Sequence, residues 1–281
     1  KVIFKYKPII IFLAILILFV SLPASKKYEE IVFDESHGNW ASVNNNFNEE
    51  SFGRNYFYSY SILREFVERK YETKFFKKEK EIVLNKKKSL LIIKMPIKQL
   101  SKSYIERVSE WVSNGGHLLV ISDHTNLYNS TFYLNELLNR FGILISETAV
   151  FDKNGQPNRY TNSLTSFLFP SADSNIENME WLTGSSLKTF PANFIPLGTY
   201  NLSYSEDGDY SNPNRFGKFQ PQLSLPLINH ISFGKTNYKK GKVYILLDST
   251  PWSNFSLSKE MYKKYVSNIL IICETNLYDF M

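Results

Sequence analysis

The stretch Asn114–Asn126, NGGHLLVISDHTN, decides the fold that this sequence predicts. Its centre, His117–Ser122, is a continuous apolar run, which is typical of a strand buried on both faces of a sheet. The two glycines before the run end an amphipathic helix over Ser101–Val112, and a polar turn follows the run. A helix, a buried strand and a polar turn in this order form the repeating unit of an α/β protein.

The same alternation continues on both sides of this stretch. Apolar runs separated by segments of helical period favour a mainly parallel sheet flanked by helices on both faces. The other predicted strands are Glu30–Phe33, Tyr71–Phe76, Ser89–Lys94 and Lys242–Leu247, and the other predicted helices are Tyr58–Arg69, Thr131–Arg140 and Lys259–Cys273. A hairpin-like approach through Ile231–Phe233 and Gly241 leads into the last strand. We therefore predict an α/β domain over residues 28–281.

Residues from about 152 to 229 break this pattern. Gly, Pro, Asn and Ser cluster repeatedly there, and only short apolar pieces appear, such as Leu164–Phe169 and Phe194–Leu197. A loop of that length without secondary structure is uncommon in a compact domain. We predict a β-rich lobe inserted into the α/β domain, because its aromatic side chains need a place to pack.

The first 27 residues predict a membrane anchor. Pro8–Ala24 is an uncharged apolar stretch of 17 residues that follows the basic stretch KVIFKYK. As a helix it would be about 25 Å long, close to the thickness of a bilayer core. A secretory signal peptide is the alternative, and Ser21–Ser25 resembles a cleavage site. In both cases the preceding basic residues keep the N-terminus in the cytoplasm, so the sequence predicts an extracytoplasmic domain, held at the cell membrane by a single-pass transmembrane helix if the anchor is retained.

Composition excludes several classes of protein. Hydrophobic residues make up 43% of the chain and charged residues 21%, which is enough apolar content for a core and excludes wholesale disorder. The densest lysine run lies within residues 77–88 and is interrupted by Glu79 and Glu81, as in a solvated loop, so a nucleic-acid partner is not expected. A single cysteine, Cys273, excludes a disulfide framework and a thiolate metal cluster.

Polar clusters follow three of the predicted strands. Ligands of open α/β sheets bind beyond the carboxyl ends of the strands, so parallel neighbours would bring the three clusters to one crevice. The candidate ligand-binding residues are Asp34, Glu35, His37, Asp123, His124, Asn126, Asp248, Ser249, Thr250, Trp252 and Asn254.

Three chemistries and one structural role fit these residue types. No organic cofactor is expected, but a divalent metal is admitted, with Asp34, His37, Asp123, His124 and Asp248 as ligands, although their spacing matches no compact metal motif. Hydrolysis could use Ser249 as nucleophile, His124 as base and Asp34 as orienting acid, although no G-x-S-x-G elbow is present. Paired carboxylates are a further option. Alternatively, these side chains only cap helices and close Asx turns.

The order of these motifs resembles a known family. The motifs are DESHG at 34–38, MP at 95–96, NGGHLLVISDHTN at 114–126 and GKVYILLDSTPWSNF at 241–255. They resemble membrane-anchored extracytoplasmic domains with a class I glutamine amidotransferase-like, flavodoxin-like fold, a group that includes auxiliary subunits of gliding-motility-type ABC transporters. The resemblance covers roughly residues 28–150 and 228–275. Enzymes of that superfamily carry a Cys nucleophile on a sharp strand-to-helix turn, with a His partner.

This chain departs from the family pattern at the nucleophile, because Cys273 lies in the last predicted helix. The resemblance therefore implies a fold reused for binding or for different chemistry. The first hypothesis is a membrane-tethered extracytoplasmic domain that binds a ligand or partner. The alternatives are an extracytoplasmic hydrolase of glycan, peptide or ester bonds that uses the Asp/His cluster, and a structural subunit of an envelope or transporter complex. The expected partners are the membrane and other envelope or transporter subunits.

Overall fold

The computed structural model describes residues 28–38, 42–43, 59–84, 89–152, 154–155, 160–164, 179–181, 184–200, 202–209, 211 and 226–274. The predicted anchor, residues 1–27, lies outside the described residues. Within the described ranges, no helix combines the length and the apolar character that crossing a membrane requires.

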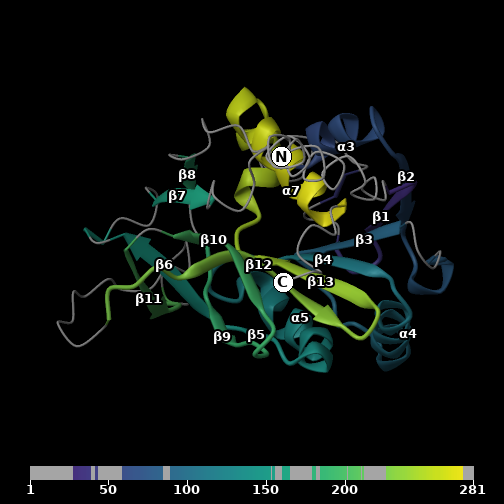
Figure 1. The fold of residues 1–281 in the computed structure, drawn as a ribbon, viewed down its shortest axis with the longest axis horizontal. Coiled ribbons are helices and arrows are strands. Elements are labelled where there is room, and N and C mark those ends of the chain that lie inside the picture. Colours follow the sequence, from purple (N-terminus) through teal and green to yellow (C-terminus); the bar gives the residue numbers. More distant parts are fainter. Residues whose placement is uncertain are drawn as a thin grey trace, which may run out of the picture.

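A nine-stranded sheet in the order β2-β1-β3-β4-β13-β12-β10-β7-β8 forms the centre of the molecule (Figure 1). Its first five strands are β2 (Glu72–Phe76), β1 (Glu30–Asp34), β3 (Ser89–Lys94), β4 (His117–Ile121) and β13 (Gly241–Leu246). These five pair in parallel. Their order is the 2-1-3-4-5 order of a doubly wound, flavodoxin-like sheet. Because the chain moves from β1 out to β2 and then back to β3, the topological switch point lies between β1 and β3.

Helices cover both faces of the parallel strands, as Figure 1 shows. Helices α3 (Ser61–Glu68) and α7 (Glu260–Glu274) cover one face, and α4 (Lys102–Ser113) and α5 (Ser130–Leu138) cover the other. Side chains alternate along each strand, so neighbouring residues such as Leu91 and Ile92 enter different cores. The predicted α/β class, with a parallel sheet between helices, is therefore confirmed for this part of the chain.

Helix α4 shows how the local sequence produces these elements. Ser101 caps it by accepting a hydrogen bond from the Tyr104 amide at 3.1 Å. The buried residues recur at helical spacing and face the sheet: Tyr104, Ile105, Val108, Trp111 and Val112. The helix ends where Gly115 adopts φ of +107°, and a Cβ on Gly116 would lie 2.3 Å from the Trp111 ring. The two glycines therefore allow the chain to turn tightly into β4.

The strands that continue the sheet beyond the predicted hairpin were not expected from the sequence. Strand β12 (Ile231–Tyr238) forms a hairpin with β13, as predicted, and β10 (Ile195–Tyr200), β7 (Tyr160–Leu164) and β8 (Met179–Trp181) continue the sheet beyond it. Two smaller ladders pair β6 (Thr148–Asp152) with β11 (Ser203–Asp207) and β5 (Leu144–Ile145) with β9 (Leu187–Thr189). The predicted lobe contains several strands in its described part: β10, β7 and β8 extend the main sheet, and β9 and β11 form the two smaller ladders with β5 and β6.

Candidate functional site

The predicted site residues lie at or beyond the carboxyl ends of β1, β4 and β13, which are parallel strands of one sheet. All eleven are buried, and none is more than 9% exposed. The three polar clusters therefore share one edge of the sheet, as the sequence predicts. Their hydrogen bonds decide what they can do there.

An imidazole between two carboxylates dominates the end of β1. The Nδ1 atom of His37 lies 2.6 Å from Oδ2 of Asp34, and its Nε2 atom lies 2.6 Å from Oε1 of Glu79. Glu79 belongs to the connection between β2 and β3, so the histidine joins two loops at the switch point. Ionised carboxylates can only accept hydrogen bonds, so this geometry favours the protonated, positively charged form of His37, in which both ring nitrogens donate.

Other donors complete this His37 network. Asp34 also accepts from the Ser36 amide at 2.8 Å and from the Tyr104 hydroxyl at 2.7 Å. Glu79 accepts from the amide and the hydroxyl of Ser101, at 3.0 and 2.5 Å. The network thus links the end of β1 to the cap of α4 and gives both oxygens of each carboxylate at least one donor.

The pKa shifts within the network follow from these contacts. Burial disfavours the charged forms, but the hydrogen bonds and charges of Asp34 and Glu79 outweigh it and raise the pKa of His37. Burial is likewise outweighed at Asp34, where hydrogen bonding to His37 and its charge lower the pKa. At Glu79 burial is outweighed first by the hydrogen bonds from Ser101 and then by His37, and the pKa is lowered. All three groups are therefore stabilised in their charged forms.

A second buried pair involves a residue that the sequence analysis missed. The Nζ atom of Lys94, the last residue of β3, lies 2.7 Å from Oε1 of Glu35, and both side chains are almost fully buried, at 1% and 3% exposure. The same ammonium lies 5.4 Å from the centre of the Tyr60 ring. The sequence signal for this pair was a lysine at the end of an otherwise apolar strand, because a buried lysine needs an acidic partner.

The ends of β4 and β13 share a third group of contacts. Ser249 donates to Oδ2 of Asp123 at 2.6 Å, and Oδ1 of Asp123 accepts from the His124 amide at 2.7 Å. The His124 ring lies 2.7 Å from the Thr125 hydroxyl through Nδ1. The Ser249 hydroxyl therefore donates its hydrogen bond to the Asp123 carboxylate, and the Asp34 carboxylate is bonded to His37. The predicted Ser249–His124–Asp34 arrangement is divided between two separate networks.

The remaining predicted residues have mainly structural contacts. Asp248 accepts from the Thr250 amide at 2.8 Å, which closes an Asx turn. Asn254 accepts from the Ile62 amide at 2.9 Å and so caps the first turn of α3 from a distant part of the chain. Trp252 is fully buried in the core beneath α3 and α7. These contacts match the alternative reading in which strand-end polar residues cap helices and close turns.

The metal hypothesis finds no assembled ligand set here. Among the described residues, no group of three or more His, Cys, Asp or Glu side chains is arranged to hold a metal ion. The geometry of the five candidate ligands explains this, since Asp34 and His37 bind each other and Asp123 binds Ser249.

Strained backbone marks two turns at this edge. Met95, directly after β3, has φ of +39°, and it is fully buried. Beyond β4, the non-glycine residues Thr125, Asn126, Tyr128 and Asn129 all have φ between +49° and +64°. Such conformations cost of order 1 kcal/mol each and concentrate at functional sites. The turn after β4 also leads directly to a pocket near this edge.

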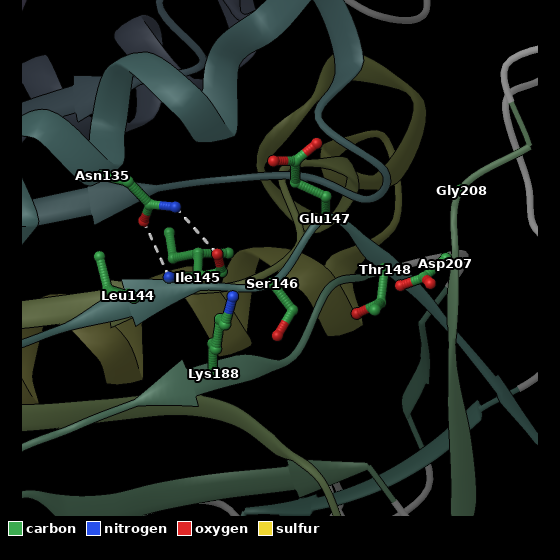
Figure 2. Close-up of a pocket in the computed structure, with 9 residues that line it drawn as sticks. All are labelled: Asn135, Leu144, Ile145, Ser146, Glu147, Thr148, Lys188, Asp207 and Gly208. Carbon is green, nitrogen blue, oxygen red and sulfur yellow. Dashed lines mark hydrogen bonds between the residues drawn. The ribbon is translucent and has the colours of Figure 1, made fainter.

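A pocket of about 480 Å³ opens between α5 and the strands of the inserted lobe (Figure 2). It is lined by Asn135, Leu144, Ile145, Ser146, Glu147, Thr148, Lys188, Asp207 and Gly208. Asn126 connects it to the strand-end turn, because its amide lies 3.4 Å from Oε2 of Glu147 and it accepts from the Phe132 amide at 3.1 Å. Asn126 is thus a predicted site residue whose side chain contacts the pocket lining.

The pocket walls are held rigidly although its charged groups are exposed. The side-chain amide of Asn135 makes both possible bonds to the backbone of Ile145, at 2.8 and 2.9 Å. The hydroxyls of Thr148, Ser186 and Ser205 bond one another at 2.7 to 3.1 Å. Glu147, Lys188 and Asp207, in contrast, are exposed to solvent. None of the three is a predicted site residue, because they lie in or beside the lobe, where the sequence shows no regular pattern of helices and strands.

Comparisons with known proteins give a family and a fold. A family model described as "Domain of unknown function (DUF4350)" matches residues 61–270. No curated protein matches the chain. Among solved structures, the mmIFT52 N-terminal domain is 14% identical, with 88% of this chain and 98% of that domain covered and a TM-score of 0.59. Cytoplasmic protein STM1381 from Salmonella typhimurium LT2 is also 14% identical, with coverage of 88% and 100% and a TM-score of 0.50. At such identities the likeness is one of fold.

Proposed function

This chain belongs to the DUF4350 family, and we propose that it is a membrane-tethered extracytoplasmic binding domain with a glutamine amidotransferase-like fold and no assembled nucleophile. Its ligand site is the pocket between α5 and the inserted lobe. The observation that carries the proposal is the contrast between this open, charged pocket and the closed hydrogen-bond networks at the neighbouring strand ends.

The strand-end networks support binding over hydrolysis. A serine nucleophile needs a base that accepts its proton in a geometry open to substrate. Ser249 instead donates to buried Asp123 at 2.6 Å, and both nitrogens of His37 face carboxylates. These groups already have the partners that substrate would have to displace.

The turn after β3 and the one cysteine support the same conclusion. Met95 occupies a strained turn of positive φ at the carboxyl end of β3, and a thioether is not a hydrolytic nucleophile. Cys273 lies in α7, fully buried, and burial raises the pKa of its thiol far above the ordinary value. The fold therefore retains a sharp turn without a reactive group on it.

The place where the chain enters the fold supports the tether. Tyr28 is fixed at the amino edge of the sheet, where its hydroxyl donates to the Cys273 carbonyl at 2.6 Å and also contacts the His117 ring. Three residues separate Ala24, the end of the apolar stretch, from Tyr28, and they span at most about 14 Å of extended chain. An embedded stretch would therefore keep the amino edge near the lipid headgroups, with the carboxyl edge facing away.

Two measurements on the full chain test this proposal. Carbonate-washed membranes should retain the chain, and a protease added outside intact cells or spheroplasts should degrade its domain. Release by carbonate, or protection until the membrane is broken, would contradict the tether.

The second measurement tests for catalysis. Chromogenic ester, glycoside and peptide substrates should not be turned over by the purified chain. Turnover that disappears in Asp123→Asn or His37→Gln, while the variant remains folded by circular dichroism, would establish the hydrolase instead.

A further inference from the structure

The charges of the pocket are separated by sign and by position. Lys188 belongs to β9 and lies at the irregularity where β9 pairs with Leu144 and Ile145. Asp207 ends β11 and is the register partner of Thr148. Figure 2 shows Lys188 beside Ile145 and Asp207 beside Thr148, with Ser146 between them and the Glu147 carboxylate pointing away from both. One end of the pocket is therefore cationic and the other anionic.

The backbone holds these two ends apart. Ile145 ends β5 and Thr148 begins β6, with a bend at Glu147 between them. The Glu147 carbonyl accepts from the Gly208 amide at 3.1 Å, which ties the bend to the residue after β11. A complementary ligand carries a cation and an anion on separate groups.

The uncharged side chains of the lining are bonded to the pocket wall, so the separated charges are the main source of ligand recognition. The Asn135 amide is bound to the Ile145 backbone, and the Thr148 hydroxyl is bound to Ser186 and Ser205. Their hydrogen-bonding capacity is largely used within the wall. The exposed charges of Lys188 and Asp207 are the groups best placed to meet a ligand.

We propose that the pocket binds a small zwitterionic ligand such as a short peptide, its ammonium toward Asp207 and its carboxylate toward Lys188. This rests on the proposed binding function and names its ligand class. A free peptide has both charges at its termini, so it can meet the anionic and the cationic end of the pocket together. A cavity of about 480 Å³ lies within the usual size range of small-molecule sites.

Calorimetric titration of the full chain in detergent with tri-alanine tests the proposal. Tri-alanine should bind, and the same peptide with an acetylated amine and an amidated carboxylate should bind roughly tenfold more weakly or not at all, because both terminal charges are lost. Lys188→Ala should weaken binding roughly tenfold, whereas Lys188→Arg, which keeps the charge, should stay within about threefold. Lys240→Ala, at the opposite edge of the sheet, is the matched control and should change nothing.

The outcomes separate this inference from the binding function itself. Equal affinity for the free and the blocked peptide, or unchanged affinity in Lys188→Ala, would overturn the proposal that the ligand is a zwitterion. Hydrogen exchange then locates any other ligand. Protection of residues 144–148 by a neutral tetrasaccharide, with no effect of tri-alanine, would retain the pocket as a binding site and reject the peptide. If neither probe protects the pocket, the zwitterion is rejected and the pocket loses its support as the ligand site.

Discussion

Two regions near the carboxyl edge of the same sheet use polar side chains in opposite ways. At the switch point between β1 and β3, the charged groups of Asp34, His37, Glu35 and Lys94 are buried and paired with one another. At the pocket beside the lobe, the charged groups of Glu147, Lys188 and Asp207 face solvent on a rigid wall. The first arrangement holds loops in place, and the second places charge on the solvent-facing wall of a pocket. The comparison shows that convergence of polar residues at strand ends does not by itself make a reactive site.

The largest effect should come from breaking the Lys94–Glu35 pair. Lys94→Met leaves a carboxylate buried without its cation, so we expect a loss of about 3–5 kcal/mol in the free energy of unfolding. The double variant Lys94→Met/Glu35→Leu should recover most of that loss, because no uncompensated charge remains. Urea unfolding followed by circular dichroism measures both. A loss below about 1 kcal/mol in the single variant would mean that the pair is not buried as described.

The hydroxyl of Tyr104 should have a smaller but clear effect. Tyr104→Phe removes a donor to the buried Asp34 carboxylate while keeping the ring, so the loss should be about 1–3 kcal/mol. Ser109→Ala, on the same helix and bonded to the Ile105 carbonyl, is a matched control that should cost about 0.5 kcal/mol or less. Equal losses in the two variants would indicate that Asp34 does not depend on this bond.

The pH dependence of the free energy of unfolding should report on the His37 network. The raised pKa of His37 adds stability that is fully present below its unfolded value of about 6.5 and is lost as pH rises through the folded value. The lowered pKa values of Asp34 and Glu79 add stability that is present above the ordinary carboxyl values, about 4, and is lost as pH falls through the folded values. The His37 network should therefore be most stable between these limits. His37→Gln should remove the loss on the alkaline side.

Substitutions in the pocket should have the smallest effect on stability. Lys188→Ala and Asp207→Asn alter exposed side chains, so each should change the free energy of unfolding by about 0.5 kcal/mol or less. Urea unfolding beside the Lys94 variant gives the comparison directly. Losses comparable with that variant would show that these charges are structural and would remove the distinction between the regions.

The sequence predicts the parallel half of the fold well because its signals are local. The run His117–Ser122 and the glycines before it specify a buried strand after a helix, and both are observed. The same pattern predicts where the strands end, so the shared edge of Asp34, Asp123 and Asp248 could be inferred. The hydrogen-bond partners could not be inferred, because His37 pairs with Glu79 across 42 positions of the chain.

The lobe illustrates the opposite case. Its strands β9 and β11 are short and pair with β5 and β6, which lie before them in the chain. Such non-local pairing leaves little periodic signal over three to five residues. Lys188 and Asp207 therefore read as ordinary surface residues in the sequence, and the pocket appears only when the strands are assembled.

Hydrogen–deuterium exchange of the full chain in nanodiscs, with and without a panel of small peptides and oligosaccharides, tests the central claim most directly. The claim is that the pocket beside the lobe binds a ligand while the strand-end networks hold the structure. A bound probe should protect residues 144–148, 187–189 and 207–208 and leave 34–38 and 95–98 unchanged. Protection at 34–38 and 95–98, with no change around the pocket, would contradict it.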